Sequence, residues 1–237
     1  MPDQEFVCNV CGGTEFVDFR DRKKVRCAKC RTLERGRLMY MALQDLGLIK
    51  PRAMVLHIAP EAGIARGIKE VVKSGYHGVD IHYKRFPVDL GVTKFNLITD
   101  TASLPSKKYD LIIHSHVIEH LPCNMTMVLL HLHRALKRNG KHVFCLPFSR
   151  GKYKANFNKL SNEQRTSEFG QFDHVRRFGK EDIDRHIGMI FKLTPHDHLK
   201  YNSPDEILRV NSPIPQPGTI NGNTIFVQDK DSLRVGV

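Results

Sequence analysis

The sequence predicts an α/β fold, a parallel sheet with helices on its faces, preceded by a small zinc ribbon. Two observations support this prediction. In residues 54–82, an apolar run stops at a turn, apolar residues recur at near-helical spacing, and a second apolar run follows, which is the pattern of one right-handed βαβ unit. Near the N-terminus, Cys8 and Cys11 form a Cys-x2-Cys pair that Cys27 and Cys30 repeat, a spacing typical of zinc ligands.

The four N-terminal cysteines predict a zinc site in residues 1–32. Two such pairs can place four thiolates tetrahedrally around one Zn²⁺, and the charged residues 18–24 would form the tip between two short strands. The alternative is a redox dithiol or a pair of disulfides, which is disfavoured because a cytoplasmic protein keeps its thiols reduced. Cys123 and Cys145 lack paired spacing, so we interpret them as ordinary thiols.

Residues 33–50 are predicted to form a helix that links the ribbon to the sheet. Thr32 is the expected N-cap, and apolar residues at helical spacing precede Gly47. The ribbon is basic, which suits nucleic acid, but its aromatic residues are only Phe6, Phe16 and Phe19, which supports a base-stacking platform poorly. We therefore favour a scaffold that packs on the larger domain over a nucleic-acid-binding module.

The composition indicates a soluble protein with an anionic or polar partner. The 237 residues carry a formal net charge of +12, which favours nucleic acid, a nucleotide-linked compound or a phosphorylated glycan. No stretch approaches about eighteen uninterrupted apolar residues, and the N-terminal segment lacks the pattern of a signal peptide. We expect a cytoplasmic protein with no membrane partner, and residues 51–237 are long enough for one α/β domain.

Carboxylates lie at the predicted strand ends of this domain. Asp80 follows the second strand, where it can accept hydrogen bonds from both hydroxyls of a ribose in the crevice beyond the sheet. Asp100 ends a third strand over residues 95–100. The turn after the first strand holds only Gly63 and includes Pro60, which lacks an N–H donor, so a phosphate-cradling loop is disfavoured. We expect a nucleoside-like cofactor rather than a dinucleotide or a triphosphate.

The order of these segments resembles a known enzyme family. Acidic strand ends followed by DTASLP and by YDLIIHSHVIEHLP are similar to the class I S-adenosylmethionine-dependent methyltransferases. The subgroup with EH-(L/V)-P after the fourth strand, which includes the ubiquinone-biosynthesis O-methyltransferases, is the most similar. The resemblance covers residues 53–147 and implies a Rossmann-like seven-stranded sheet, with Asp80 on the ribose of S-adenosylmethionine and Asp100 near its adenine amino group.

The first loop departs from the family pattern. It reads HIAPEAG from His57 to Gly63 where the family has acidic-x-Gly-x-Gly-x-Gly. The resemblance implies that this loop lies under the methionine moiety of the cofactor, with Ala59 as the small residue that allows close approach and Glu61 as a partner for the cofactor ammonium. The departure leaves one alternative open, a degenerate fold that no longer binds the cofactor.

A histidine-rich motif follows the fourth strand, at a position that faces the cofactor methyl group in a fold of this type. His114 lies in this motif, and His116, Glu119 and His120 have the i, i+3, i+4 spacing that one helical turn gathers on one side. Three interpretations stay open. The matching positions of ubiquinone-type enzymes hold a divalent metal, for which His116 in place of Glu would favour a softer ion. Otherwise His116 or His120 is a general base, or Glu119 and His120 only pin the loop.

Residues 149–179 are predicted to form a flap over the acceptor site. Residues 149–166 are polar, basic and aperiodic, which is typical of a mobile loop. The following FGQFDHVRRFG is similar to a segment of bacterial zinc-ribbon methyltransferases, and His174 and Arg176 in it could bind or deprotonate the acceptor. The alternative is a salt-bridged corner formed with Asp173.

The remaining pattern predicts the other elements of the domain. The apolar spacing predicts an amphipathic helix over residues 124–136 and a fifth strand over residues 143–146. A helix is expected to start near Lys180, and a terminal antiparallel pair is expected over residues 191–194 and 224–227.

These observations predict methyl transfer from S-adenosylmethionine to an oxygen or nitrogen of a polar small molecule or glycan intermediate. One alternative is an RNA methyltransferase that binds RNA through the basic ribbon. The other is a non-enzymatic nucleic-acid-binding protein on a degenerate fold.

Overall fold

A six-stranded sheet forms the centre of the computed structural model, which describes residues 5–234. Two smaller sheets, of two and three strands, lie outside it. The strands are β1 (Phe16–Phe19), β2 (Arg22–Cys27), β3 (Val55–Ile58), β4 (Tyr76–Asp80), β5 (Thr93–Lys94), β6 (Tyr109–Ser115), β7 (Leu136–Cys145), β8 (Phe148–Ser149), β9 (Lys154–Ala155), β10 (Arg176–Gly179) and β11 (Phe226–Gln228). The α-helices are α1 (Glu34–Asp45), α2 (Ala62–Val72), α3 (Met125–Ala135), α4 (Asn162–Phe169), α5 (Ile187–Ile190) and α6 (Pro204–Arg209).

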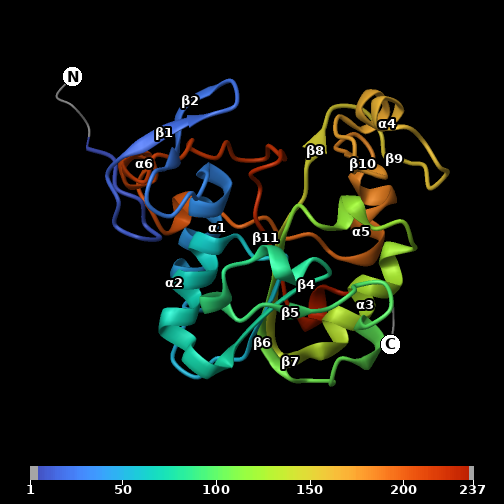
Figure 1. The fold of residues 1–237 in the computed structure, drawn as a ribbon, viewed down its shortest axis with the longest axis horizontal. Helices are drawn as coiled ribbons and strands as arrows, with labels where there is room; N and C mark the ends of the chain where they lie inside the picture. The colour runs from blue at the N-terminus through green and yellow to red at the C-terminus, as the bar shows by residue number, and fades with distance from the viewer. Residues whose placement is uncertain (1–4, 235–237) are drawn as a thin grey trace.

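The central sheet has the order β11-β7-β6-β3-β4-β5 (Figure 1). Its strands are parallel except β11, which runs antiparallel to β7. All four residues of β3 are buried, as expected for a central parallel strand covered on both faces. Apolar residues of α1 and α2 pack on one face of the sheet, and those of α3 pack on the other. The predicted α/β class is therefore confirmed.

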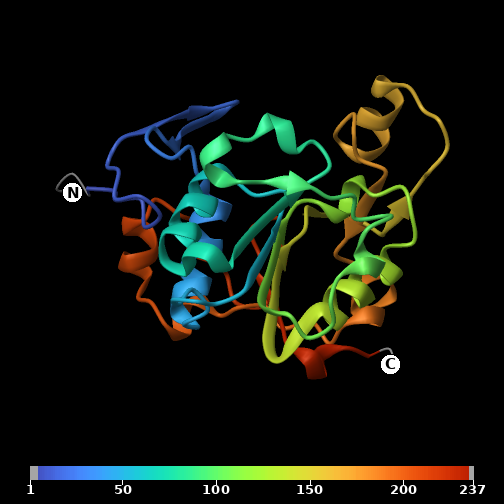
Figure 2. The same cartoon turned by 60° about the horizontal axis from the view of Figure 1, so that its bottom comes forward.

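The end of the N-terminal ribbon, after the hairpin of β1 and β2, packs against the start of α2. A Cβ added to Gly63 would lie 2.7 Å from the carbonyl oxygen of Cys30 and 2.7 Å from Oγ1 of Thr32, so only glycine allows this approach. The backbone N–H of Val7 donates to the carbonyl of Arg209 at 2.8 Å, which places α6 beside the ribbon (Figures 1 and 2). Thr32 is not the N-cap of α1, because Leu33 holds that position and the Thr32 hydroxyl contacts Sγ of Cys30 at 2.7 Å.

The predicted flap has regular structure instead of an irregular loop. Residues 149–179 contribute to the sheet of order β8-β10-β9 and form α4, and this lobe lies away from the ribbon across the top of the sheet (Figure 2). A capping box begins α4, because the Ser161 hydroxyl accepts from the N–H of Gln164 and the Gln164 side chain accepts from the N–H of Ser161. The hydrophobic periodicity misses this helix because it is short and mostly exposed.

The third strand is shorter and earlier than predicted. It is Thr93–Lys94, and residues 97–100 form a turn instead. The side chain of Asp100 accepts from the N–H of Asn96 at 2.8 Å, and the side chain of Asn96 accepts from the N–H of Ile98 at 2.9 Å. Such local bonds from side chain to backbone compete with pairing in a sheet.

Only one of the two predicted terminal strands joins the described sheet. Residues 191–194 form no strand, and the chain touches β11 only through an isolated bridge between Pro195 and Phe226. The bridge has two backbone bonds, from the N–H of His196 to the carbonyl of Ile225 at 2.7 Å and from the N–H of Val227 to the carbonyl of Thr194 at 2.9 Å, whereas the N–H of Lys192 donates to the carbonyl of Ser232, beyond β11. The sheet of the described residues therefore has six strands where seven are predicted, with the expected class preserved.

The other differences are small. β7 begins at Leu136 rather than at residue 143, with a register irregularity between Tyr109 and Leu111 of its partner. The helix expected near Lys180 is a 3₁₀ turn, Ile183–Arg185, followed by the short α5. Among the described helices, none combines the length and the apolar character needed to cross a membrane.

Candidate functional site

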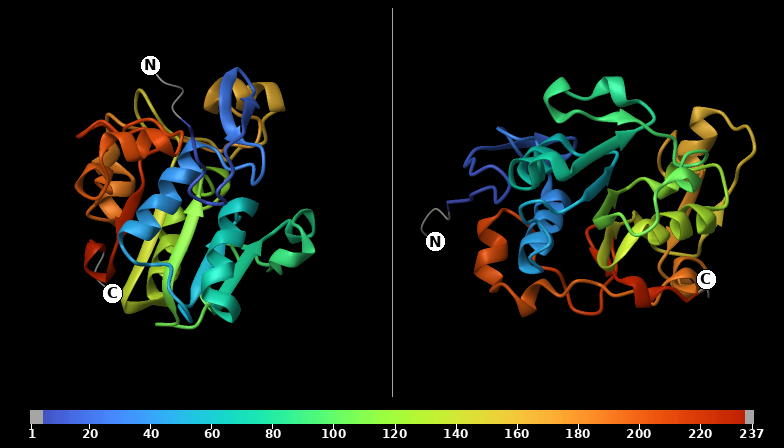
Figure 3. Two further views of the ribbon diagram at one scale, coloured as in Figure 1. Left: turned by 90° about the vertical axis from the view of Figure 1, so that its left-hand side faces the viewer. Right: turned by 90° about the horizontal axis from the view of Figure 1, so that it is seen from below.

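A cavity of about 500 Å³ opens at the carboxyl ends of β3, β4 and β6. In Figure 3 this end of the sheet carries both the ribbon and the lobe of α4. The cavity combines apolar walls with a few carboxylates and imidazoles, which is typical of a small-molecule site. It is lined by Ile58, Ala59, Asp80, Ile81, His82, Arg85, Phe95, Asn96, Leu97, Ile98, His116, Val117, His120, Leu121, Pro122 and Asp173.

Asp80 is the buried carboxylate of the cavity. Its side chain is 6% exposed at the end of β4, and it accepts from the N–H of His82 at 2.6 Å. Its second oxygen accepts from the guanidinium of Arg85 at 3.0 Å, and the Arg85 side chain is 60% exposed. Because Arg85 can move into solvent, this oxygen can accept a ligand hydroxyl instead.

Ala59 brings the backbone close to the cavity. It has a φ of 47°, and its N–H donates to the carbonyl of Val79 at 2.8 Å. A left-handed backbone is costly for a residue with a Cβ, and the smallest such side chain limits both the strain and the bulk at the cavity wall. Ala59 thus lines the cavity, and its role in close approach of the cofactor stays a prediction.

Glu119 lies beneath the cavity without a hydrogen-bond partner. Its side chain is fully buried in the 3₁₀ turn Ile118–His120, and neither carboxyl oxygen meets a donor among the described residues. Burial raises the pKa of Glu119 to about 8. Nδ1 of His116 lies 3.8 Å from this carboxyl, and Nε2 of His120 lies 4.0 Å from it, so the predicted gathering of the three residues is confirmed.

The hydrogen bonds of His116 and His120 assign their tautomers. Nε2 of His116 lies 3.1 Å from the carbonyl of Gly222, and Nδ1 of His120 lies 3.1 Å from the carbonyl of Asp173. A carbonyl only accepts, so both of these nitrogens carry a proton. In the neutral rings the other nitrogen then offers a lone pair, and in both rings it faces Glu119. Burial lowers the pKa of His116 to about 3, which keeps that ring neutral.

His174 and Arg176 lie behind the cavity rather than in its wall. The rings of His174 and His120 are perpendicular with centroids 4.8 Å apart. The buried guanidinium of Arg176 donates to the carbonyls of Leu121 and Cys123 at 2.5 and 2.6 Å. Arg176 thus holds the loop after the histidine motif, while Asp173 pairs with His120 at 3.4 Å and not with Arg176.

Four predicted cofactor residues do not line the cavity. His57 and His114 are buried in the sheet, where His57 contacts the Tyr76 hydroxyl at 3.1 Å and His114 stacks on Phe144. The Asp100 carboxylate is bonded within its own turn. Glu61 instead pairs with Arg35 at 3.2 Å on the ribbon side of the loop.

Arg35 lies near the cavity, and the sequence pattern does not predict its position there. Its Nε donates to the Ser115 hydroxyl at 2.9 Å, so one side chain of α1 joins the end of β6 to Glu61 before α2. Arg85 on Asp80 and Gly222 on His116 are missed too. No local signal identifies these contacts, because the partners of Arg35 and Gly222 are distant in sequence and Arg85 lies in an ordinary basic loop.

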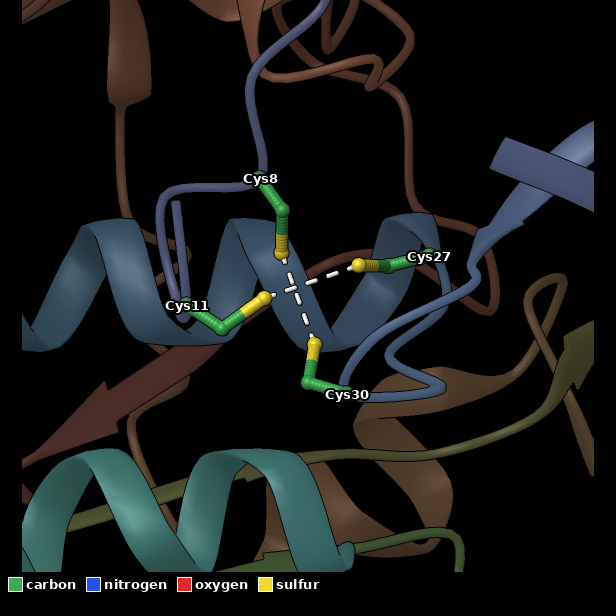
Figure 4. A group of neighbouring side chains, drawn as sticks. All are labelled: Cys8, Cys11, Cys27 and Cys30. Atoms are coloured by element: carbon green, nitrogen blue, oxygen red, sulfur yellow. Dashed lines mark hydrogen bonds between the residues drawn. The ribbon is translucent and has the colours of Figure 1, made fainter. Parts of the chain in front are cut away.

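The four N-terminal cysteines form a second candidate site (Figure 4). Their sulfur atoms point toward a common centre, all within 4.8 Å of one another. Sγ of Cys8 lies 3.6 Å from Sγ of Cys30, and Sγ of Cys11 lies 3.6 Å from Sγ of Cys27. A disulfide would need about 2 Å, and all six cysteines are free. The predicted disulfide alternative is therefore absent from the structure.

A family model described as a methyltransferase domain matches residues 35–207. No curated protein matches the chain significantly.

Several solved structures are similar in fold. One described as "a putative sarcosine dimethylglycine methyltransferase from Galdieria sulphuraria" is 16% identical, with a TM-score of 0.50, and the match covers 92% of this chain and 95% of that chain. A SAM dependent methyltransferase from Archaeoglobus fulgidus is 17% identical, with a TM-score of 0.43, covering 81% and 92%. The 1,6-didemethyltoxoflavin-N1-methyltransferase of Burkholderia thailandensis is 16% identical, with a TM-score of 0.43, covering 80% and 76%.

Proposed function

Because the chain belongs to the methyltransferase domain family, whose model matches residues 35–207, we propose that it methylates an oxygen or nitrogen of a polar small molecule or glycan intermediate. The chain is an S-adenosylmethionine-dependent methyltransferase, and the part that we propose is the class of its acceptor. One observation supports this acceptor class most directly. A single cavity has the Asp80 carboxylate in one wall and the histidines of the 116–120 motif in another.

The cavity residues fit the cofactor. S-adenosylmethionine, when bound, supplies a methyl group activated by a sulfonium. Asp80 would accept from the ribose hydroxyls, and Phe95, Leu97 and Ile98 supply apolar wall for the adenine. The retained cavity and its buried carboxylate argue against the alternative of a degenerate fold.

His120 is the proposed general base. Its Nδ1 is fixed by the carbonyl of Asp173, so Nε2 is the nitrogen that would take a proton from the acceptor. His116 also lines the cavity, so an acceptor hydroxyl or amine finds two imidazoles there, while Glu119, neutral because burial raises its pKa to about 8, lies buried behind them. Positioning of the acceptor next to the methyl donor would supply most of the rate.

A divalent metal bound at this motif is the second candidate. One ligand atom from each of Glu119, His120 and His174 lies within 4.8 Å of the others. His174 rather than His116 completes this set, and two imidazoles with one carboxylate suit a borderline ion such as Zn²⁺. If the ion is required, activity is lost on chelation and restored by added metal, whereas general-base catalysis by His120 needs none.

The ribbon of residues 1–32 is proposed to bind one structural zinc. Tetrahedral ligands at a Zn–S distance near 2.3 Å lie roughly 3.8 Å apart, and the two closest sulfur pairs are both 3.6 Å apart. The contact of Cys30 and Thr32 with Gly63 favours the scaffold role for this ribbon.

Replacing Asp80 by Ala tests the cofactor assignment. We expect S-adenosylmethionine to bind more weakly by about 1.5–3 kcal/mol, roughly ten- to 150-fold, because a charged acceptor of hydrogen bonds is lost. Calorimetric titration measures this. Asp89→Asn, at an exposed carboxylate paired with Arg66, is the control and should keep the wild-type affinity. Equal affinities for Asp80→Ala and wild type would refute the assignment.

Replacing His120 by Asn tests the base. Asn can keep the hydrogen bond to the carbonyl of Asp173 but has no basic nitrogen, so kcat should fall by roughly 10²- to 10⁴-fold, the usual contribution of general-base catalysis. Cofactor affinity should change little. His131→Asn, a half-buried histidine on α3, is the control. A variant with unchanged kcat on an identified acceptor would exclude His120 as the base.

A further inference from the structure

A third group of metal-binding side chains lies apart from the ribbon and from the cavity at the strand ends. It is formed where the C-terminal end of α1 meets residues 195–202. Asp45, His196 and His198 each offer one ligand atom, all within 4.8 Å of one another. Nε2 of His196 lies 2.8 Å from the carboxylate of Asp45, and the rings of His196 and His198 are perpendicular with centroids 4.5 Å apart.

An ion pair between Asp45 and His196 does not explain why His198 is buried beside them. Its side chain is 3% exposed, and neither of its ring nitrogens has a hydrogen-bond partner among the described residues. Leaving a buried polar group without a hydrogen-bond partner destabilises the folded state. Hydrogen bonding between His196 and Asp45 accounts for those two residues alone, whereas a metal ion between the three would also give a nitrogen of His198 a partner.

The surroundings of Asp45 suit a cation. Asp45 is the last residue of α1, at the end of the helix where the dipole is negative and a positive charge is favoured. The side-chain amide of Asn202 donates to both of its oxygens, at 3.1 and 3.0 Å, and Tyr201 stacks on His196 with centroids 5.2 Å apart. Supporting contacts of this kind orient the ligands of metal sites.

The site borders a cavity that is partly open to solvent. His196 and His198 line this cavity of about 380 Å³, and its other walls come from Leu38, Pro195, Asp197 and residues between 213 and 225. With three protein ligands, a tetrahedral ion keeps one position free, and here that position would face the cavity.

We propose that Asp45, His196 and His198 bind a second zinc ion, with one coordination position open to this cavity. Two imidazoles and one carboxylate are a set that Zn²⁺ accepts. For Nε2 of His196 to bind the ion, the proton that now faces the Asp45 carboxylate would move to Nδ1 of the same ring, so the ligand stays a neutral imidazole. Small rotations of the side chains would bring the three ligand atoms to a common ion.

Metal content per chain tests this site. The wild-type protein and the variants His198→Ala and Asp45→Asn are equilibrated with zinc, dialysed and measured by elemental analysis. Asp45→Asn keeps the size and polarity of the side chain, so it guards against loss of zinc through misfolding. His131→Ala, at a histidine outside these three groups, is the matched control. We expect both site variants to hold one zinc fewer per chain than wild type and the control.

Cobalt substitution gives a readout specific to the ligands. Co²⁺ bound by cysteines gives intense absorption from sulfur-to-metal charge transfer, which a histidine and carboxylate site lacks. The variant His198→Ala should keep the sulfur bands of the ribbon and lose only weaker visible absorption. Equal zinc contents in all four proteins, or loss of the sulfur bands alone in His198→Ala, would overturn the proposal.

Discussion

At the scale of single residues, the position of the proton on each group of the candidate site follows from its surroundings. His116 and His120 donate to backbone carbonyls, so their free nitrogens both face Glu119. The lone pairs of the two imidazoles repel a carboxylate, so they favour the neutral form of the Glu119 carboxyl. Burial acts in the same direction, since it raises the pKa of Glu119 from its ordinary value of 4.5 to about 8.

The stability of the protein should therefore depend on the protonation of Glu119. The folded state binds the proton of Glu119 more tightly than the unfolded state does. The stability that this proton adds to the folded state is therefore fully present below pH 4.5 and is lost as pH rises through about 8. The opposite shift of His116, whose pKa falls to about 3, gives stability that is present above pH 6.5 and lost on acidification. Between pH 5 and 8 we expect wild type to lose roughly 2–4 kcal/mol relative to Glu119→Gln.

Denaturant unfolding of both proteins without cofactor at the two pH values measures this difference. Zinc binding and the histidines change with pH in both proteins, so their effects largely cancel in the comparison. Glu70→Gln, at an exposed carboxylate of α2, should follow wild type. A Glu119→Gln variant with the same pH dependence as wild type would show that Glu119 is ionised in the folded protein.

At the scale of elements, the sequence predicts those parts whose signal is local. The βαβ unit around Asp80, the helix α3 and the paired cysteines all follow from periodicity or spacing, and all are present. The turn before Asp100 and the capping box of α4 override periodicity through side-chain bonds to the backbone. The placement of Arg35 depends on how α1 packs, so no local pattern could reveal it, and the same holds for the burial of His57 and His114.

The ribbon and the cofactor loop are coupled through contacts between elements. Cys30 and Thr32 touch Gly63, and Arg35 connects Glu61 with Ser115. Loss of zinc should loosen this end of α2, and coupling through packed elements is on the order of 0.5–2 kcal/mol. We expect Cys27→Ser to bind S-adenosylmethionine roughly two- to thirtyfold more weakly, with the sheet domain still folded.

Calorimetric titration with circular dichroism measures both parts of this prediction. Cys123→Ser, at a free cysteine outside the ribbon, is the control and should keep wild-type affinity. If Cys27→Ser has lost its zinc but binds the cofactor as wild type does, the ribbon does not support the loop.

At the scale of the whole molecule, the formal charge of +12 attracts anionic partners, which include both RNA and small anionic acceptors. The basic ribbon and the lobe of α4 both lie over the end of the sheet that carries the cavity (Figures 2 and 3). The ribbon offers few free rings for stacking. The guanidinium groups of Arg20, Arg22 and Arg26 lie 5.2–5.8 Å from the ring of Phe19, and that of Arg37 lies 5.0 Å from the ring of Phe16. These contacts favour a compact polar acceptor over RNA.

A salt series separates the two acceptor classes. An RNA that pairs with several basic side chains releases counterions, so its affinity should fall on the order of a hundredfold or more between low and moderate salt. A small acceptor carries one or two charges, and its dependence is shallow. We expect the shallow dependence for activity on a small acceptor and no submicromolar binding of mixed cellular RNA.

A pair of variants with equal net charge gives the decisive comparison. In the first variant, Arg22, Lys23 and Lys24 of the ribbon are changed to Glu. In the control variant, the exposed Lys50, Lys107 and Lys192 are changed to Glu. Tight, steeply salt-dependent RNA binding that only the ribbon variant abolishes would establish RNA as the partner, because net charge is the same in both variants and only the position of the lost charges differs.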